Sequence, residues 1–334
     1  MFPQEPLVVR VMREHKDAIL AGEDRAMAEM AGQWLRLEQM LDAQIAELAR
    51  EVADLAAKKQ LPSQAQLMRM ERYKKLIFQL RAESGKYAQW ADGFVTTYQG
   101  QLAEKGLTHA AEAIKAAFAD AGGIGAHFDV LHVNAIEAMI GLAGDGSPLA
   151  KYLRQIHGEA ANGITQALID GVTMGIHPTK IAEMMRDGLG MGLQTAMNTA
   201  RTESLRAYRQ ASLMQYDASG VVSGYKRISA HDERVCAGCL FTEGEIYSDL
   251  SQFSEHNQGR CTAVPVLEGI SEPNWITGQD WFVQQDESTQ ASILGPGRFE
   301  AWKNGASLDQ MVTRIEDPTW GGAFVPTPVG ELGQ

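Results

Sequence analysis

Two long apolar stripes near the start of the chain limit the folds that it can adopt. From residue 14 to 58, apolar residues recur in steps of three and four, the spacing that places them on one helix face. A second stripe follows Leu61-Pro62-Ser63, where proline interrupts a helix and serine can cap the next one. The stripes comprise Met27, Met30, Trp34, Leu37, Leu41, Ile45, Leu48, Val52 and Leu55, then Met70, Ile77, Leu80, Tyr87, Ala91, Phe94 and Tyr98. They predict two long helices packed as an antiparallel hairpin with a coiled-coil-like seam.

Helical patterning continues through the middle of the chain, between glycine-rich breaks. Residues 127–142 are expected to form one helix, and residues 149–218 several more. The turn before Thr179 starts one of these, with Thr179 as the expected capping residue. The last of them, residues 193–216, contains the sequence Arg201-Thr202-Glu203.

After Gly220 the residue pattern changes from helical to mixed. Residues 221–228 and 261–267 are each expected to form a strand, and Pro265 restricts the second to a sheet edge. A short helix is expected at residues 281–294. Most tryptophans of the chain lie beyond residue 270, so this segment should pack against the rest of the protein. Residues 321–334 contain prolines and glycines and are expected to be extended or unfolded in isolation.

These patterns predict a mostly α protein. A long N-terminal helical hairpin and a helical middle precede a small α+β module that zinc could staple. The predicted divisions are a helical hairpin at residues 1–120, a helical region at 121–218, the module at 219–268 and a Trp/Gly/Pro-rich segment at 269–334.

Composition excludes several classes of protein. A hydrophobic fraction of 45% supports packed cores, and the chain has no run of 18 apolar residues that would predict a membrane span. The N-terminus lacks the basic start and apolar stretch of a secretory signal, and three cysteines fit a reducing compartment rather than a disulfide framework. A net charge of −12 argues against a protein that coats DNA non-specifically.

All three cysteines lie close to a histidine in the sequence. Cys236-x2-Cys239 and His256-x4-Cys261 form two pairs of thiolate and imidazole donors, the ligand types of a closed structural zinc site. They are therefore the predicted zinc ligands. Two alternatives stay open: Cys236 and Cys239 are small buried thiols beside an ordinary surface histidine, or they form a redox pair. The redox alternative is weaker because no strand–CxxC–helix pattern surrounds them.

Charged residues precede the cysteines in two places. Asp232 and Arg234 lie just before Cys236 and could supply a turn and hydrogen bonds to the metal ligands. Arg201, Glu203 and Arg206 lie on the helix expected at residues 193–216. Taken alone, these three residues indicate a solvated ion-pair network, since Glu203 and Arg206 are three positions apart.

The order of these motifs resembles the phage Mu F-like minor head proteins, also called phage head morphogenesis proteins. The resemblance rests on Ala200-Arg201-Thr202-Glu203, Arg206-Ala207-Tyr208, Gly220 to Tyr225, Asp232-Glu233-Arg234-Val235-Cys236-Ala237-Gly238-Cys239 and His256-Asn257-Gln258-Gly259-Arg260-Cys261. It covers about residues 150–268. The family pattern closes with His-Pro-x-Cys-Arg-Cys, whereas this chain has Asn257 and Gly259 at the proline and first cysteine. Four candidate ligands are left, with Cys261 as the fourth.

The resemblance implies a virion component associated with the phage portal and other capsid components. Such a protein assembles in the host cytoplasm and assists head assembly, DNA packaging or DNA ejection, with packaged DNA as a further possible partner. On this hypothesis the protein is not an enzyme. The zinc site is structural, and Arg201, Glu203, Arg206, Tyr208, Asp232 and Arg234 serve structure or partner contacts.

Two alternative functions compete with this hypothesis. One is a nuclease of the His-Cys zinc type, for which only Ala230-His231-Asp232 and His256-Asn257 could supply catalytic groups. Using His256 as a zinc ligand leaves that site incomplete. The other is a zinc-stapled nucleic-acid-binding module, with a basic face formed by Arg201, Arg206, Arg209, Lys226 and Arg227.

Overall fold

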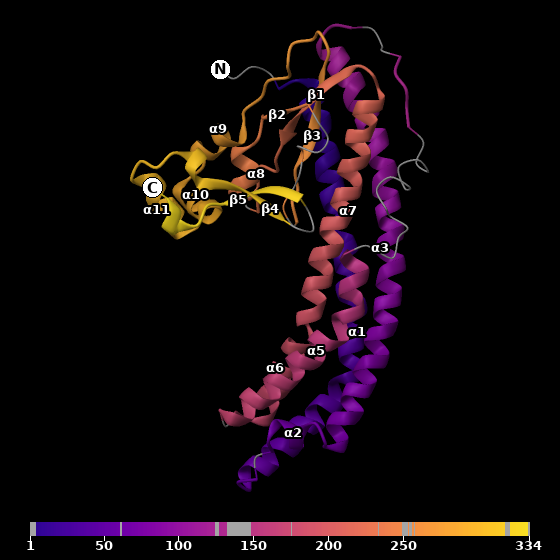
Figure 1. Ribbon diagram of the computed structural model, residues 1–334, viewed down its shortest axis with the longest axis vertical. Coiled ribbons are helices and arrows are strands. Elements are labelled where there is room, and N and C mark those ends of the chain that lie inside the picture. The colour runs from indigo at the N-terminus through magenta and orange to yellow at the C-terminus, as the bar shows by residue number, and fades with distance from the viewer. Residues whose placement is uncertain are drawn as a thin grey trace. The chain divides into compact units, whose positions relative to one another are not determined.

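The protein is mostly helical, with long N-terminal helices and a small sheet-containing module, as predicted (Figure 1). The computed structural model describes residues 5–60, 62–123, 127–131, 148–174, 176–232, 234–248, 253, 256, 258–317 and 321–332. It divides into two compact units, which are described separately. The helical unit comprises Glu23–Tyr98 and Gly144–Arg201, and the Cys/His unit comprises Met1–Gly22, Gln99–Ala143 and Thr202–Gln334.

Three helices contribute residues to both units. They are α1 (Leu7–Ala57), α3 (Glu71–Asp120) and α7 (Met191–Ala218). The helical unit also contains α2 (Gln64–Leu67), α5 (Pro148–Thr173) and α6 (Pro178–Leu189).

Within the helical unit, α1 and α3 run side by side in opposite directions (Figure 1). Arg72 near the start of α3 pairs with Glu47 and Glu51 near the end of α1, at 2.7 and 3.0 Å. Further along, the Tyr87 hydroxyl donates to the Met30 carbonyl at 3.4 Å. The two long stripes therefore form the predicted antiparallel hairpin, joined by α2, whose N-terminus Ser63 caps.

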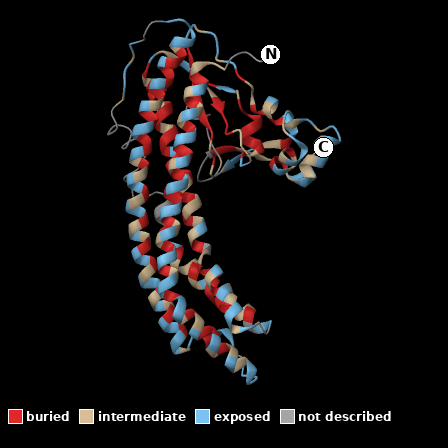
Figure 2. Cartoon of the chain, turned by 180° about the vertical axis from the view of Figure 1, so that it is seen from behind, coloured by how far each residue is buried: buried red, intermediate tan, exposed pale blue. Residues whose placement is uncertain are grey.

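The stripes form the core of the helical unit, as Figure 2 shows by the buried residues along the helices. The α1 stripe residues from Met27 to Val52 are all buried, and Trp34 packs edge-on against Tyr87 at 4.9 Å. Leu168 of α5 and Met185 of α6 belong to the same core. Helices α5, α6 and the first turns of α7 therefore complete a core that the hairpin begins.

Helices α5 and α6 meet at a pair of glycines. A Cβ atom on Gly163 would lie 2.1 Å from the Gly188 carbonyl oxygen, so only glycine allows this approach. Helix α6 begins after His177, whose Nδ1 accepts a hydrogen bond from the Thr179 backbone at 3.3 Å. The prediction that Thr179 caps this helix is wrong: Pro178 already occupies the first turn, which moves the cap to His177.

The Cys/His unit contains a three-stranded antiparallel sheet of order β2-β1-β3. Its strands are β1 (Val222–Ile228), β2 (Ile246–Tyr247) and β3 (Thr262–Leu267). Among the described residues, strand β3 lies at an edge of the sheet and pairs only with β1. A proline such as Pro265, which has no backbone N–H, is tolerated at such an edge because no strand pairs with the outer side of an edge strand. The sheet packs on an apolar core that includes Val8 and Met12 of α1, Ile114 of α3 and Tyr216 of α7. The Tyr216 hydroxyl links α7 to β3 by donating a hydrogen bond to the Ala263 carbonyl at 3.0 Å.

The C-terminal segment packs beside this sheet, as its tryptophans predicted. It comprises α9 (Gly278–Val283), α10 (Glu287–Leu294), α11 (Pro296–Lys303), a 3-10 turn at Leu308–Met311, the antiparallel pair β4 (Val312–Asp317) and β5 (Gly321–Pro326), and a last 3-10 turn at Val329–Glu331. The single helix predicted at 281–294 is wrong. Two helices form because Thr277 and Asp286 each cap a separate start.

Two further predictions concern a helix in the middle of the chain and the absence of a membrane span. Residues 127–131 are not helical, and the rest of the helix predicted at 127–142 lies outside the described residues. Within the described part of the chain, no helix is both long and apolar enough to span a bilayer.

Candidate metal centre

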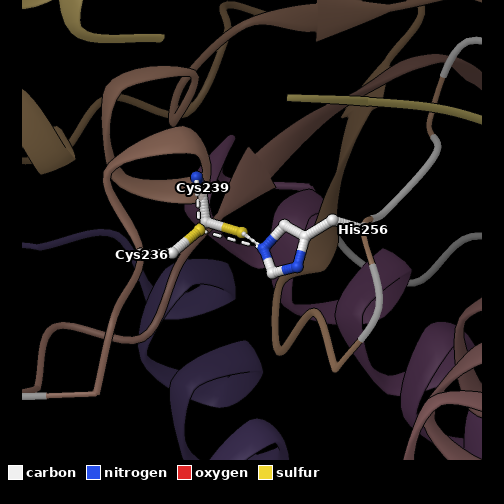
Figure 3. A group of neighbouring side chains, drawn as sticks. All are labelled: Cys236, Cys239 and His256. Atoms are coloured by element: carbon white, nitrogen blue, oxygen red, sulfur yellow. Dashed lines mark hydrogen bonds between the residues drawn. The ribbon is translucent and has the colours of Figure 1, made fainter. Parts of the chain in front are cut away.

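Cys236, Cys239 and His256 come together in the Cys/His unit (Figure 3). Cys236 immediately precedes α8 (Ala237–Phe241), and its Sγ accepts a hydrogen bond from the Cys239 backbone at 3.2 Å. The thiol therefore caps the helix, and Cys239 presents its own thiol one turn later. His256 comes from the chain between β2 and β3, and its Nε2 lies 2.9 Å from the Cys236 sulfur and 3.2 Å from the Cys239 sulfur.

This donor set fits a metal ion of the zinc type. In tetrahedral zinc sites, neighbouring sulfur and nitrogen ligands are separated by about 3.6 Å, so small outward movements of these side chains would accommodate the ion. Hydrogen bonding with Cys239, and then with His256, lowers the pKa of the Cys236 thiol to about 5 against the opposing effect of burial. A thiol that ionises easily is suited to metal coordination because the thiolate is the ligand form.

The fourth predicted ligand, Cys261, is placed differently. The three ligand atoms that lie within 4.8 Å of one another are those of Cys236, Cys239 and His256, and Cys261 is not in that group. Cys261 nevertheless lines the same small cavity, is buried, and lies directly before β3. The cavity volume is about 30 Å³, enough for an ion or one water molecule but not for a substrate.

Asp232 stabilises the turn that precedes Cys236. Its carboxylate accepts two hydrogen bonds from the Arg260 guanidinium, at 2.6 and 2.7 Å, and one from the Arg234 backbone at 3.0 Å. Burial raises the pKa of Asp232, but the hydrogen bonds and charge of Arg260 outweigh it and keep the pKa below its usual value. Asp232 thus connects the turn before Cys236 to the residue before Cys261, while Arg234 itself is exposed at the cavity.

Helix α7 holds the closing loop through two contacts that the sequence did not reveal. The Thr202 hydroxyl accepts from the Gln258 backbone at 2.9 Å, and buried Arg209 donates to the Gly259 carbonyl at 2.9 Å. Gln258 adopts a positive φ of 63°, an uncommon conformation that these contacts support. The Arg-Thr-Glu helix therefore positions the loop between His256 and Cys261. No local signal could have shown this, because the partners are 50 or more residues apart.

The other motif residues on α7 have separate surroundings. Glu203 is buried and accepts from the Gln99 amide at 3.2 Å. The Tyr208 hydroxyl is 3.0 Å from His109 Nδ1, and burial raises the pKa of Tyr208 well above its usual range. Arg206 is exposed. Arg201, within the helical unit, pairs with Glu23 and with Asp24.

Some residues of the two alternative functions are engaged elsewhere. Arg209 and Arg227 are both buried, and the Arg227 guanidinium lies over the Phe253 ring at 4.5 Å, so neither contributes to an open basic face. For a nuclease, His231 would need to act with Asp232. Instead His231 contacts Glu243 at 2.6 Å.

A family model described as Phage Mu protein F like protein matches residues 162–263. This region is Phage Mu F-like. The match covers less than half of the chain, but it includes α7, β1, β2, the start of β3 and all four predicted zinc ligands. Comparison with curated proteins and with solved structures finds no match. The Phage Mu F-like region suggests a phage head morphogenesis protein, found in the virion with other capsid components as partners.

Proposed function

We propose that this protein is a minor capsid protein that docks on the phage portal through its helices. There it assists head assembly, DNA packaging or DNA ejection, and packaged DNA is a further partner. It acts without catalysing a reaction. The Phage Mu F-like region is the observation that carries the proposal.

The metal centre has a structural role in this proposal. Cys236, Cys239 and His256 would hold a zinc ion, and Cys261 would complete the set from the same cavity. A bound zinc ion supplies a cross-link between chain segments that are distant in sequence. The 30 Å³ cavity supports a structural rather than a catalytic site, because it leaves no room for a substrate beside the ion.

Helical docking is supported by the long exposed helix surfaces of the helical unit. Phe78 of α3 has a ring that is 77% exposed, and it is the apolar side chain on these surfaces at which we place the portal contact. Phe78→Asp should weaken binding to the portal without unfolding the protein. Ala18→Asp on α1 is the matched control, since it makes the same charge change at an exposed position of the other unit.

The test has two parts. Mass spectrometry of purified virions should detect the chain at a few copies per head, and co-expressed portal protein should co-elute with wild type and Ala18→Asp but poorly with Phe78→Asp. Absence from virions would contradict the head-protein proposal. Presence in virions with no co-elution of wild type and portal would contradict the portal contact alone.

A further inference from the structure

A buried carboxylate lies in the Cys/His unit, apart from the metal centre. The Glu243 side chain is 0% exposed and accepts hydrogen bonds from the Ser229 hydroxyl at 2.7 Å and from the Trp275 indole at 2.9 Å. It also contacts His231 Nε2, at 2.6 Å. A buried charge is tolerated only with such partners. Because Glu243 engages Nε2, Nδ1 is the ring nitrogen that His231 can offer to another molecule.

Basic groups outnumber this buried carboxylate. The Arg13 guanidinium lies 4.0 Å from Glu243, and Lys16 is close enough to interact with it electrostatically while its Nζ donates to the Ser229 carbonyl at 2.5 Å. With His231, three basic side chains lie around Glu243. Arg13 also lines the solvent side of this cluster, where its guanidinium can pair with an anion.

A cavity of about 480 Å³ opens at that side. Its apolar lining residues are Trp275, Ile276 and Trp281. Its polar lining residues are Glu5, Arg13, His231, Asn274 and Asp280. The His231 ring stacks on Trp281, with centroids 5.1 Å apart and planes inclined by 21°, which fixes the imidazole at the cavity wall. A small apolar group would fill the space between these walls, and the volume is within the range of small-molecule sites.

Glu5 shows that Arg13 binds a carboxylate at this cavity. Its carboxylate lines the cavity and receives a hydrogen bond from Arg13 Nε at 2.8 Å. Glu5 precedes α1, and its side chain is 35% exposed. Ion pairs of this exposure contribute at most about 1 kcal/mol, so another carboxylate can exchange with Glu5. The second acid at the cavity, Asp280, already accepts hydrogen bonds from Thr277 at the start of α9.

We propose that this cavity is a binding site for a carboxylate attached to an apolar group. The ligand carboxylate replaces Glu5 on Arg13 and reaches His231, while the apolar group lies against the tryptophans. The ligand is either a free small carboxylate or an acidic side chain next to an apolar residue in a partner protein. The site is independent of the proposed head function and of metal binding.

Binding can be followed through the indole N–H signals of Trp275 and Trp281 in the 15N-labelled full-length protein, assigned with Trp→Phe variants. Phenylacetate should shift both signals, whereas its neutral amide, phenylacetamide, should not. Glu5→Gln should bind phenylacetate up to about fivefold more tightly, because it removes the competing carboxylate. Arg13→Gln should bind at least about tenfold more weakly, and the exposed neighbour Arg10→Gln should match wild type.

The peptides Ac-Phe-Glu-NH2 and Ac-Phe-Gln-NH2 distinguish the two sources of the ligand. Tighter binding of the Glu peptide than of phenylacetate would assign the site to a partner protein, and the reverse order would assign it to free carboxylates. The proposal is overturned if phenylacetamide binds as well as phenylacetate. It is also overturned if neither carboxylate probe shifts the indole signals of Glu5→Gln.

Discussion

The core of the helical unit and the His256 loop of the Cys/His unit are stabilised in different ways. In the helical unit, the stripe from Met27 to Val52 is buried together with residues of five other helices, so many similar apolar contacts share the stabilisation. In the Cys/His unit, the loop around His256 depends on a few polar contacts: the thiols, Asp232 with Arg260, and Thr202 and Arg209 from α7. A single change should therefore remove a smaller share of the stabilisation from the helical core than from the His256 loop.

The largest effect is expected from loss of the metal centre. Structural zinc contributes about 10–16 kcal/mol in isolated zinc-finger peptides, far more than one apolar side chain. Cys239→Ser, or EDTA on the wild type, should increase amide hydrogen exchange strongly in β1, α8 and β3. Exchange in α5 and α6 should change little. If EDTA changed the exchange rates in β1, α8 and β3 no more than those in α5 and α6, the predicted difference between the two units would be contradicted.

The next largest effect is expected inside the helical unit. Trp34 is 1% exposed and packs on Tyr87, so Trp34→Ala should lower the free energy of unfolding by about 3–5 kcal/mol. Leu35→Ala is the adjacent control, because Leu35 is 52% exposed and its truncation should have little effect. Urea denaturation followed by circular dichroism measures both. Similar losses for the two variants would mean that the stripe is not the core.

A smaller effect is expected at the contact of α5 with α6. Gly163→Ala would place a methyl group against Gly188 and should cost about 1–3 kcal/mol, since the backbones must separate. Gly158→Ala, on the same helix with open space around it, should instead stabilise by up to about 1 kcal/mol. Thermal melts of both variants test this difference in sign. A neutral Gly163→Ala would contradict the close approach of the two helices.

The smallest effect is a pH dependence in the Cys/His unit. Burial, with the charges of His15 and Lys105, lowers the pKa of His109 to about 4. Between pH 6.5 and 4 the unfolded chain therefore binds a proton that the folded protein does not, so stability falls as the pH decreases through this range. At pH 5.5 the loss should be about 1 kcal/mol relative to pH 7. His109→Gln should remove that part of the slope in urea denaturation, and an unchanged slope would contradict it.

The sequence predicted the parts of the fold that local patterns determine. The hairpin, the strand around Tyr225 and the edge position of the Pro265 strand all follow from spacing or from the chemistry of one residue. The wrong predictions also arose locally. A proline next to His177 moved a helix cap by two residues, and the cap at Asp286 divided a helix expected to be continuous.

The candidate site was only partly predictable, for a different physical reason. The spacing of Cys236 and Cys239 is local, since a capping turn brings both thiols to one side of α8. The support from Thr202 and Arg209 joins residues that are distant in sequence, and the contact of His231 with Glu243 likewise depends on the tertiary structure. Metal binding stays a prediction, because the arrangement of donors shows suitability rather than occupancy.

The most direct test of this account is the zinc content per chain of the purified protein, compared with Cys236→Ser and Cys261→Ser. We predict about one zinc per wild-type chain and almost none in Cys236→Ser, with local unfolding of the Cys/His unit. Cys261→Ser should bind zinc more weakly if Cys261 is the fourth ligand. A well-folded wild-type protein without zinc, even after incubation with zinc salt, would contradict the structural metal centre.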